Sequence, residues 1–550
     1  MVDNETIYLG LYTDGATISS NSTKNLWILG ATILNLPLAI RSALKNFVQI
    51  FAFYGEGKPP WHIFVKHFAR LLQKNVTIEE KTYKIQILQV NADLPAQQSL
   101  FNLKFGGYFP CVKCKVKGAR EKNLITFKNY NNVRRTPEEY LAESTEALQT
   151  NSPVGPIVGL CSLRKFLTIP TCITVDYMHT FLGGPIKTNL IELFAAKKIA
   201  DVADQIISLI VSSTLPSELR GRRISKTDQL GNFKATEWKL MMNYVFVVTF
   251  LEIFGNKSIL GKDWTKKQKQ FLNVLYGISG VMILCLDIIS EEQLEYADKL
   301  VKFWFENRAE LWSDNPWLPK AHMMTHFVEQ VRQHGPLHKS SCFPGESLMG
   351  MAAKKVSSNK PEVILEQICR RTKQTSDVTE WAECNTYGQL KGILKFLLKT
   401  RNASDFSYEI PSDSEMAKKF EIDPLLGLRK AKIQGYEFEI DNEKKSRNSI
   451  AYYDNGLTVR PAVIQHIYMD KFENLWIQLK PLRIKLPFEI VPELTTELLR
   501  NKHFLTGYGQ LIGEDRPIIV KSESIRRKGF IISSPTKNYV VPLLHVYEHN

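Results

Sequence analysis

The chain has 550 residues, of which 44% are hydrophobic, and a formal net charge of +15. This hydrophobic content is ordinary for globular proteins, which argues against wholesale disorder and leaves room for roughly three or four core-sized units. The basic balance fits a polyanionic partner, most often nucleic acid, although a solvated basic surface would give the same charge. Eight scattered cysteines exclude a dense disulfide framework and indicate a reducing compartment.

The first part of the chain reads as strands around one helix. Residues 6–14 alternate between apolar and polar side chains and end at Asp14-Gly15, which predicts a strand that ends in a carboxylate. A strand, a strand, a helix and a strand follow, over residues 26–34, 46–54, 61–74 and 82–90. This order begins a ribonuclease-H-like fold, in which the first and fourth strands are neighbours. Asp14 and Asp93, just past the fourth strand, are therefore expected side by side.

The middle of the chain changes in character after a helix that opens at Pro95. Helical spacing recurs over residues 134–150, 190–215, 238–253, 266–289 and 290–307. This stretch is too long for a loop and predicts a helical insertion. Residues 320–357 return to the first domain, and from about 430 to 545 the apolar period falls to two, which predicts a β-rich module.

The predicted class is therefore α/β: a ribonuclease-H-like core interrupted by a large all-α insertion and followed by a β-rich C-terminal module. The predicted segments are a first part of the core, the helical insertion, a second part of the core and the β-rich module, over residues 1–118, 119–315, 316–404 and 405–550. The longest apolar runs, 241–254 and 274–289, are interrupted or too short to span a bilayer. We read them as buried helices and expect no membrane.

Two cysteines and two histidines have the spacing of metal ligands. Cys111 and Cys114 form a CxxC pair, which is half of a tetrahedral zinc site. His322 and His326, about 200 residues later, share one helix face because they are four residues apart. A shared zinc site across this gap makes sense only if two core segments flank an insertion. The alternative to a zinc site is a pair of buried thiols and two ordinary helix histidines. A metalloprotease helix is disfavoured because Met323 occupies the position of the general-base glutamate.

Three acids are candidates for a second metal site. Phosphodiester transfer needs two divalent ions about 3.5–4 Å apart, and Mg²⁺ or Mn²⁺ is held by carboxylates. Asp14, Asp93 and Glu346 can supply them if the fold brings them together. Each has an ordinary alternative: Asp14 before a glycine in a turn, Asp93 as a helix cap and Glu346 as a solvated helix residue.

The motif order over about residues 8–400 resembles the catalytic region of the CACTA (EnSpm) DNA transposases. The motifs are Asp14-Gly15, Asp93-Leu94-Pro95-Ala96, the CxxC pair, a long helical insertion, the HxxxH pair and Pro344-Gly345-Glu346-Ser347. Residues 175–179, 181–184 and 334–337 are also similar to that family. The same order is similar to the catalytic cores of the V(D)J recombinase and Transib transposases.

The resemblance implies a DDE/D core that cleaves and transfers DNA strands. It implies metal-binding catalytic roles for Asp14, Asp93 and Glu346, and a structural zinc site at Cys111, Cys114, His322 and His326. We further expect a double-stranded DNA substrate, a homodimer and a nuclear location.

Two other groups of residues have less specific roles. Asp176 and His179 form an acid–histidine pair, which we interpret as a helix cap or a buried hydrogen bond rather than a metal site. Five arginines are candidates to bind DNA phosphates, with a solvated face as the alternative: Arg134, Arg135, Arg220, Arg222 and Arg223.

The sequence departs from the family at its start, because it opens almost on the first catalytic strand. Transposases usually carry a module there that reads the transposon ends. This departure is expected of a fragment, of a degenerate copy or of a gene recruited to a host role. The second hypothesis is a domesticated, non-catalytic DNA- or protein-binding protein that retains the transposase fold. A third, a zinc hydrolase on small substrates or peptides, is disfavoured by the missing HExxH glutamate.

Overall fold

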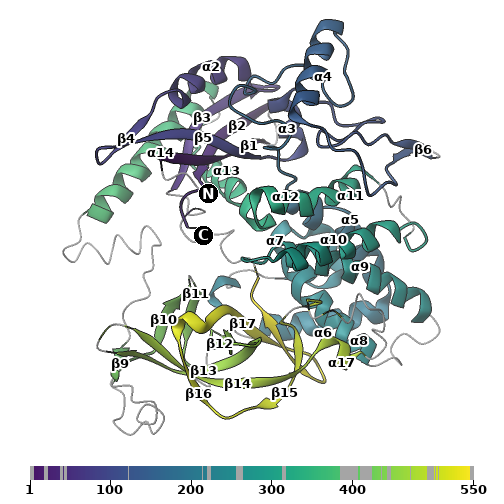
Figure 1. Cartoon of the computed structure of the whole chain (residues 1–550), viewed down its shortest axis with the longest axis vertical. Helices are drawn as coiled ribbons and strands as arrows, with labels where there is room; N and C mark the ends of the chain where they lie inside the picture. Colours follow the sequence, from purple (N-terminus) through teal and green to yellow (C-terminus); the bar gives the residue numbers. More distant parts are fainter. Residues whose placement is uncertain are drawn as a thin grey trace. The chain divides into compact units, whose positions relative to one another are not determined.

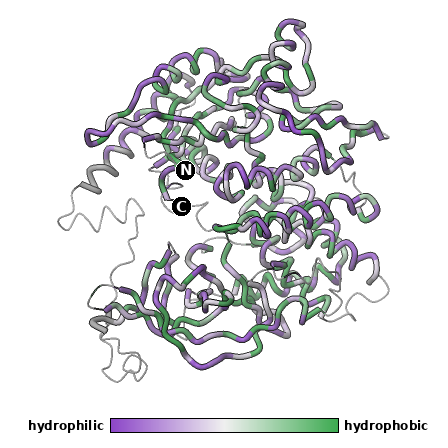
Figure 2. The backbone as a smooth tube through the Cα atoms, in the orientation of Figure 1, coloured by the Kyte–Doolittle hydropathy of each residue, from purple (hydrophilic) through white to green (hydrophobic). Residues whose placement is uncertain are grey.

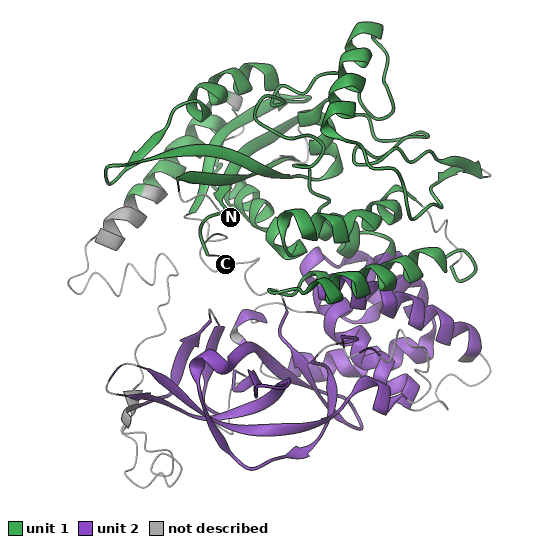
Figure 3. Cartoon of the chain, viewed as in Figure 1, with its two compact units in different colours: residues 1–185, 284–400, 547–550 green, residues 186–283, 401–546 purple. Residues whose placement is uncertain are grey.

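A computed structural model gives the fold of the chain (Figure 1). It describes residues 5–17, 23–37, 41, 46–121, 123–212, 215–219, 224–255, 264–312, 318–358, 360–384, 407–408, 424–434, 436–441, 448–470, 472, 474–491, 501, 503–505 and 507–544. The chain divides into two compact units (Figure 3). Unit 1 comprises residues 1–185, 284–400 and 547–550, and unit 2 comprises residues 186–283 and 401–546.

Unit 1 is built on a five-stranded sheet with the order β3-β2-β1-β5-β4. Its strands are β1 (Thr6–Thr17), β2 (Lys24–Ile33), β3 (Phe47–Glu56), β4 (Val76–Ile78) and β5 (Lys81–Asn91). β2 pairs antiparallel with β1 and β3, whereas β5 runs parallel to β1. The predicted pairing of the first strand with the strand before Asp93 is confirmed. The short hairpin strand β4 was not predicted.

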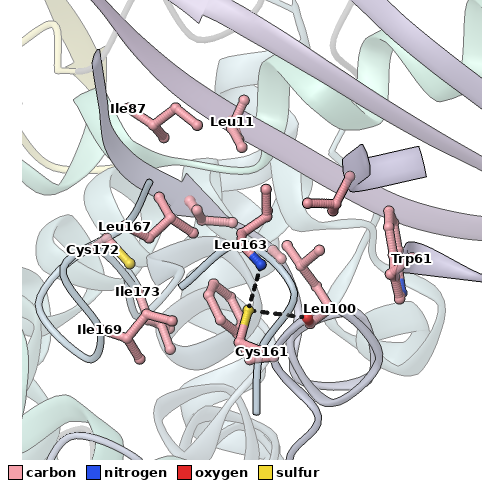
Figure 4. Close-up of a cluster of buried hydrophobic side chains, with 14 of the residues drawn as sticks. Leu11, Trp61, Ile87, Leu100, Cys161, Leu163, Leu167, Ile169, Cys172 and Ile173 are labelled. Atoms are coloured by element: carbon pink, nitrogen blue, oxygen red, sulfur yellow. Dashed lines mark hydrogen bonds between the residues drawn. The ribbon is translucent and has the colours of Figure 1, made fainter. Parts of the chain in front are cut away.

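One face of this sheet carries a continuous apolar core. Helices α2 (Trp61–Leu72) and α3 (Leu94–Phe101) pack there, and the Trp61 indole donates a hydrogen bond to Ser99 Oγ at 2.8 Å. Apolar side chains between residues 157 and 173 complete the core, and Figure 4 shows several of them beside Leu11 and Ile87 of the sheet. The main chain joins this segment to β5, because Val90 N–H donates to Cys172 C=O at 2.8 Å.

The predicted boundary at residue 119 does not coincide with a boundary between the units. Residues 119–185 belong to unit 1, because the apolar side chains of 157–173 are buried against its sheet. They include β6 (Ala119–Glu121), β7 (Leu124–Thr126), α4 (Pro137–Thr150) and the π-helical turn η2 (Met178–Leu182). Residues 284–312, with α10 (Glu291–Glu306), also belong to unit 1. The helical segment outside unit 1 is therefore 186–283.

The second half of unit 1 is helical. Its elements are α11 (Pro319–Met323), η8 (Met324–His326), α12 (Phe327–His334), η9 (Leu337–Ser340), α13 (Phe343–Lys354) and α14 (Pro361–Cys384). Helix α13 lies against β1 and α14 against β3. Segments from both halves of the sequence therefore build one unit.

Unit 2 joins helices to a β-rich region. The helices are α5 (Pro185–Phe194), α6 (Lys197–Ser212), α7 (Ala235–Leu240), η5 (Met241–Val245), α8 (Phe246–Gly255) and α9 (Trp264–Leu284). The strands that form its barrel are β12 (Ile450–Asp454), β13 (Val459–Asp470), β14 (Leu475–Lys485), β15 (Gly509–Glu514), β17 (Ile525–Ser533) and β18 (Asn538–Pro542). They pair in the order β12-β13-β14-β15-β18-β17, and β17 returns to β12. The predicted helical middle and β-rich C-terminal region are confirmed.

Buried polar bonds tie the helices of unit 2 to its strands. Lys528, fully buried, pairs with Glu218 at 2.7 Å, and Tyr539 donates to the buried Glu252 at 3.0 Å. Residues 235–255 are long and apolar enough to cross a membrane, and Figure 2 colours the chain by hydropathy. However, 94% of their most apolar 18-residue window is buried within the protein, as in an ordinary core helix. The predicted burial of residues 241–254 is therefore confirmed.

Candidate metal centre and acidic site

The CxxC pair follows α3 through a turn at Gly106 and Gly107, whose φ angles of 134° and 68° favour glycine. The main chain of the pair is then held against residues 133–135, because Arg135 N–H donates to Lys113 C=O and Lys115 N–H to Val133 C=O, both at 2.9 Å. Both cysteine side chains end up buried. The local fold therefore presents two thiols inward from one tight turn.

Helix α11 and the turn η8 bring two imidazoles to these thiols. Cys111 Sγ lies 3.3 Å from His326 Nε2, and Cys114 Sγ lies 3.3 Å from His322 Nε2. The two Nε2 atoms are also 3.3 Å apart. All four ligand atoms lie within 4.8 Å of one another, and all four residues are buried. We call these four residues the Cys/His cluster.

The Cys/His cluster can bind a metal such as zinc. Around one tetrahedral zinc ion, sulfur and nitrogen ligands lie roughly 3.3–3.8 Å apart, which the observed spacings approach. Burial opposes ionisation of Cys111, but the hydrogen bond with Cys114 and the charge of His326 outweigh it and hold the pKa of the Cys111 thiol well below its usual range. Metal binding requires such a thiolate. The donor set therefore fits zinc in type, number and spacing.

The predicted DNA-binding arginines differ in their exposure and in their hydrogen-bond partners. The Arg135 side chain is 3% exposed, pairs with Glu143 at 2.7 Å and donates to the backbone carbonyls of residues 111, 112 and 114. It supports the CxxC turn and is not available to a phosphate, so this hypothesis does not fit Arg135. Arg134 is 37% exposed and pairs with Glu329 at 2.6 Å. The other three, Arg220, Arg222 and Arg223, lie outside the described residues.

The three candidate acids come from three elements of unit 1. Asp14 lies on β1, where its Oδ1 accepts from Gly15 N–H at 2.7 Å. Asp93 caps α3 and accepts from Ala96 N–H at 2.8 Å, so the predicted cap is present. Glu346 lies in the first turn of α13. Each acid keeps oxygen atoms beyond those used in these local bonds.

The charge of Asp14 acts on both of the other acids. Burial, a hydrogen bond with Asp14 and the charge of Asp14 raise the pKa of Glu346 to about 8. The pKa of Asp93 is raised by burial and then by the charges of Asp14 and Asp176, although its bond to Ala96 opposes the shift. Neighbouring carboxylates raise one another's pKa because their negative charges repel, and a bound cation would offset this repulsion. We call Asp14, Asp93 and Glu346 the acid cluster.

Asp176 and His179 lie beside the acid cluster. Asp176 Oδ2 accepts from His179 Nδ1 at 2.7 Å and from its backbone N–H at 2.9 Å, and Oδ1 accepts from Cys342 N–H at 2.9 Å. These are the cap and buried hydrogen bonds that were predicted. His179 Nε2 lies 3.9 Å from Glu346 Oε1. Burial lowers the pKa of His179, but Asp176, Glu346 and Asp93 outweigh it and raise that pKa to about 9.

The spacing of these groups differs from that of the Cys/His cluster. Among the described residues, Asp176, His179 and Cys342 also form a set with ligand atoms within 4.8 Å of one another, whereas the acid cluster does not. The acid cluster is thus more open than the Cys/His cluster.

A glycine allows α13 to approach β1. A Cβ atom on Gly345 would lie 2.2 Å from ring atoms of Tyr12, so only glycine fits at this position. The Tyr12 hydroxyl in turn donates to Asp14 Oδ2 at 3.2 Å. This close packing brings the first turn of α13, and with it Glu346, to the strand that carries Asp14.

Sequence reasoning missed the roles of Tyr12 and Arg135. Tyr12 is two residues before Asp14 on the same face of its strand, a spacing that could have pointed to it. Nothing in the sequence signals that Arg135 donates to the CxxC turn. Searches against models of protein families and against curated proteins find no match to this chain.

Proposed function

We propose that this chain is a DNA transposase, or a protein derived from one, that cleaves and transfers DNA strands on a ribonuclease-H-like core. The observation that carries the proposal is that the charge of Asp14 acts on both Asp93 and Glu346, although these acids lie about 330 residues apart at the extremes. This mutual influence supports a shared metal site. Double-stranded DNA as substrate, a homodimer and a nuclear location belong to the same proposal.

The topology of unit 1 supports this core. Three antiparallel strands, a helix and a parallel fourth strand are the arrangement expected of a ribonuclease-H-like fold, and β1, β2, β3, α2 and β5 follow it. An isolated parallel bridge pairs Ile173 with Val90 of β5 and so extends the sheet at this strand. The acids stand on β1, after β5 and on a helix packed against β1.

The acid cluster has the chemistry that strand cleavage requires. Mg²⁺ or Mn²⁺, when bound, supplies the positive charge that aligns the attacking and leaving oxygens of a phosphodiester. Asp14 and Asp93 would hold the metal ions, and Glu346 would complete the coordination. His179, oriented by Asp176, places a cationic ring beside Glu346. The Glu346 side chain is 39% exposed, which leaves the site open to a polymer substrate.

The Cys/His cluster would hold zinc in a structural role. All four of its ligands come from the protein, so no position remains for a substrate, as is typical of structural zinc sites. Zinc would join the CxxC turn to α11 and so tie together the two halves of unit 1.

The test is DNA nicking that depends on divalent metal and on Asp93. We expect the purified chain to nick DNA in Mg²⁺ or Mn²⁺ and not in EDTA, Asp93→Asn to lose this activity, and the exposed control Glu146→Gln to keep it. Equal inertness of wild type and Asp93→Asn on DNA that contains transposon ends would contradict catalysis. Salt-dependent DNA binding without metal dependence would then favour the second hypothesis, a domesticated binding protein.

A further inference from the structure

A cavity of about 540 Å³ lies wholly within unit 1, and none of the three acids of the acid cluster lines it. Its walls come from the middle of β5, from residues between 168 and 172, and from the end of α12 with the turn η9 that follows. His334 joins two of these walls, because its Nε2 donates to Thr171 C=O at 2.9 Å, and burial lowers its pKa, so it adds no positive charge at neutral pH. The volume lies within the range of about 300–1,000 Å³ that small-molecule pockets occupy.

Two half-buried cations, Arg41 and Lys339, line this cavity, and no acidic side chain of the described residues does. Arg41 Nε donates to Leu36 C=O at 3.1 Å and Nη2 donates to Leu34 C=O, which fixes the guanidinium and leaves Nη1 without a partner in the described part of the chain. The Lys339 ammonium likewise has no hydrogen bond or ion pair there. Burial lowers the pKa of Lys339, and the charge of Arg41 lowers it further, although Asp287 opposes the shift. An anion between the two cations would offset their repulsion.

Gln89 of β5 presents an unpaired amide at the same cavity. The residue is only 4% exposed, and its side-chain amide has no hydrogen-bond partner among the residues that the structure describes. A buried amide without a partner costs free energy that a polar ligand would recover. Because the amide can both donate and accept, a hydroxyl group suits it.

We propose that this cavity binds a small phosphate ester that carries hydroxyl groups, of the class of the sugar phosphates. The phosphoryl group would lie between Arg41 and Lys339, and a hydroxyl would bind the Gln89 amide. A free phosphate ion would fill only a small part of the volume, which favours an ester. A DNA backbone offers the same phosphate chemistry, but a strand is bound along a row of exposed cations, whereas these two are half-buried in one cavity. The site goes beyond the proposed strand cleavage and does not depend on it.

The test is calorimetric titration of the full chain with ribose phosphate, ribose and inorganic phosphate, in the absence of divalent ions. We expect ribose phosphate to bind at least about tenfold more tightly than either of the other two, because it alone can use both the cations and the amide. Lys339→Gln, which removes no bond of the folded chain, should weaken the binding of ribose phosphate about tenfold, the size of one hydrogen bond to a charged group. Lys66→Gln is the matched control, because Lys66 is exposed on α2 and does not line the cavity.

A second variant separates ligand binding from a structural role of the amide. Gln89→Leu should weaken the binding of ribose phosphate about fivefold, leave that of inorganic phosphate unchanged, and keep the urea midpoint of the ligand-free chain at least as high as in the wild type. Ribose phosphate that binds no more tightly than ribose, or equally well to the wild type and Lys339→Gln, overturns the inference. So does weaker DNA binding with a smaller salt dependence in Lys339→Gln when the wild type does not bind ribose phosphate, because the cations then serve a DNA backbone.

Discussion

The Cys/His cluster and the acid cluster of unit 1 differ in burial and in the spacing of their side chains. In the Cys/His cluster all four residues are buried and their ligand atoms already lie at the spacing of one coordination shell. In and beside the acid cluster, the side chains of Glu346 and His179 are 39% and 38% exposed. Closed sets of protein ligands are typical of structural sites, and open ones of catalytic sites. The comparison teaches that burial and spacing distinguish the two clusters, and the proposed function assigns a structural role to the buried one and a catalytic role to the open one.

The difference arises from local structure. Arg135 donates hydrogen bonds to the carbonyls of the CxxC turn, and the consecutive elements α11 and η8 supply His322 and His326. The acids instead come from a strand, a helix cap and a helix that meet only through tertiary packing. Disturbing the first cluster should therefore cost stability, and disturbing the second should mainly cost function.

The largest expected effect is the loss of a zinc ligand. Cys114→Ser should lose bound zinc and lower the free energy of unfolding by at least about 3 kcal/mol, because three ligands cannot close the coordination shell. Atomic absorption and urea unfolding measure these two effects. Cys369→Ser is the control, because Cys369 is exposed and lies outside the cluster. Full zinc content in Cys114→Ser would contradict a shared metal site.

The next effect is that of the buried arginine behind the turn. Arg135→Gln should lower the free energy of unfolding by about 3 kcal/mol, because it removes donors from three carbonyls and leaves Glu143 without its partner. Arg134→Gln, which removes a half-exposed ion pair, should cost about 0–1 kcal/mol. The urea midpoints of the two variants measure this difference in stability. If Arg135→Gln changed only DNA affinity, the phosphate hypothesis for this residue would return.

A smaller effect on stability, with a larger one on function, is expected at Gly345. Gly345→Ala should cost about 1–3 kcal/mol and greatly reduce nicking, because the added methyl collides with Tyr12 and pushes Glu346 away from Asp14. Gly350→Ala on the same helix is the matched control. Nothing lies within 4 Å of its added Cβ atom, so a gain of up to about 1 kcal/mol and unchanged nicking are expected. Equal nicking by both variants would argue against the close approach.

The smallest expected effect is a pH dependence of stability without divalent ions. The pKa of Glu346 is about 8 in the folded chain and near 4.5 when unfolded, so between these values only the folded state holds the proton. Stability should therefore fall as the pH rises through this window, and His179, with its pKa raised to about 9, acts in the same direction between about 6.5 and 9. Because both side chains are partly exposed to solvent, this change of stability with pH is small.

The control for this prediction is Glu346→Gln, which cannot titrate. Its urea midpoint should change less between about pH 5 and pH 8 than that of the wild type. A wild-type midpoint that rises with pH more steeply than that of the variant would contradict the raised pKa.

Much of unit 1 could be predicted because its strands alternate regularly. Period-two spacing in residues 6–14 and 82–90 located β1 and β5, and the expected ribonuclease-H-like order indicated that these two strands are neighbours, as their parallel pairing shows. The place of residues 157–173 could not be predicted, because their buried apolar side chains follow neither helical nor strand spacing. The boundary drawn at residue 119 did not coincide with a unit boundary for this reason.

The parts of the site that escaped prediction depend on backbone atoms. The four members of the Cys/His cluster were apparent from spacing, because their side chains are themselves the ligands. Arg135 acts on backbone carbonyl groups, which have no signature in the sequence, so its role emerges only when the CxxC turn is in place. A charged residue such as Arg135 is exposed in most proteins, which favoured the wrong interpretation.

The most direct test of the central claim is Mn²⁺ binding followed by electron paramagnetic resonance. If the three acids share one metal site, Asp14→Asn, Asp93→Asn and Glu346→Gln should each weaken Mn²⁺ binding roughly tenfold or more, while zinc content stays unchanged. The exposed control Glu146→Gln should bind like the wild type. Mn²⁺ binding that is unchanged in all three acid variants would contradict the account.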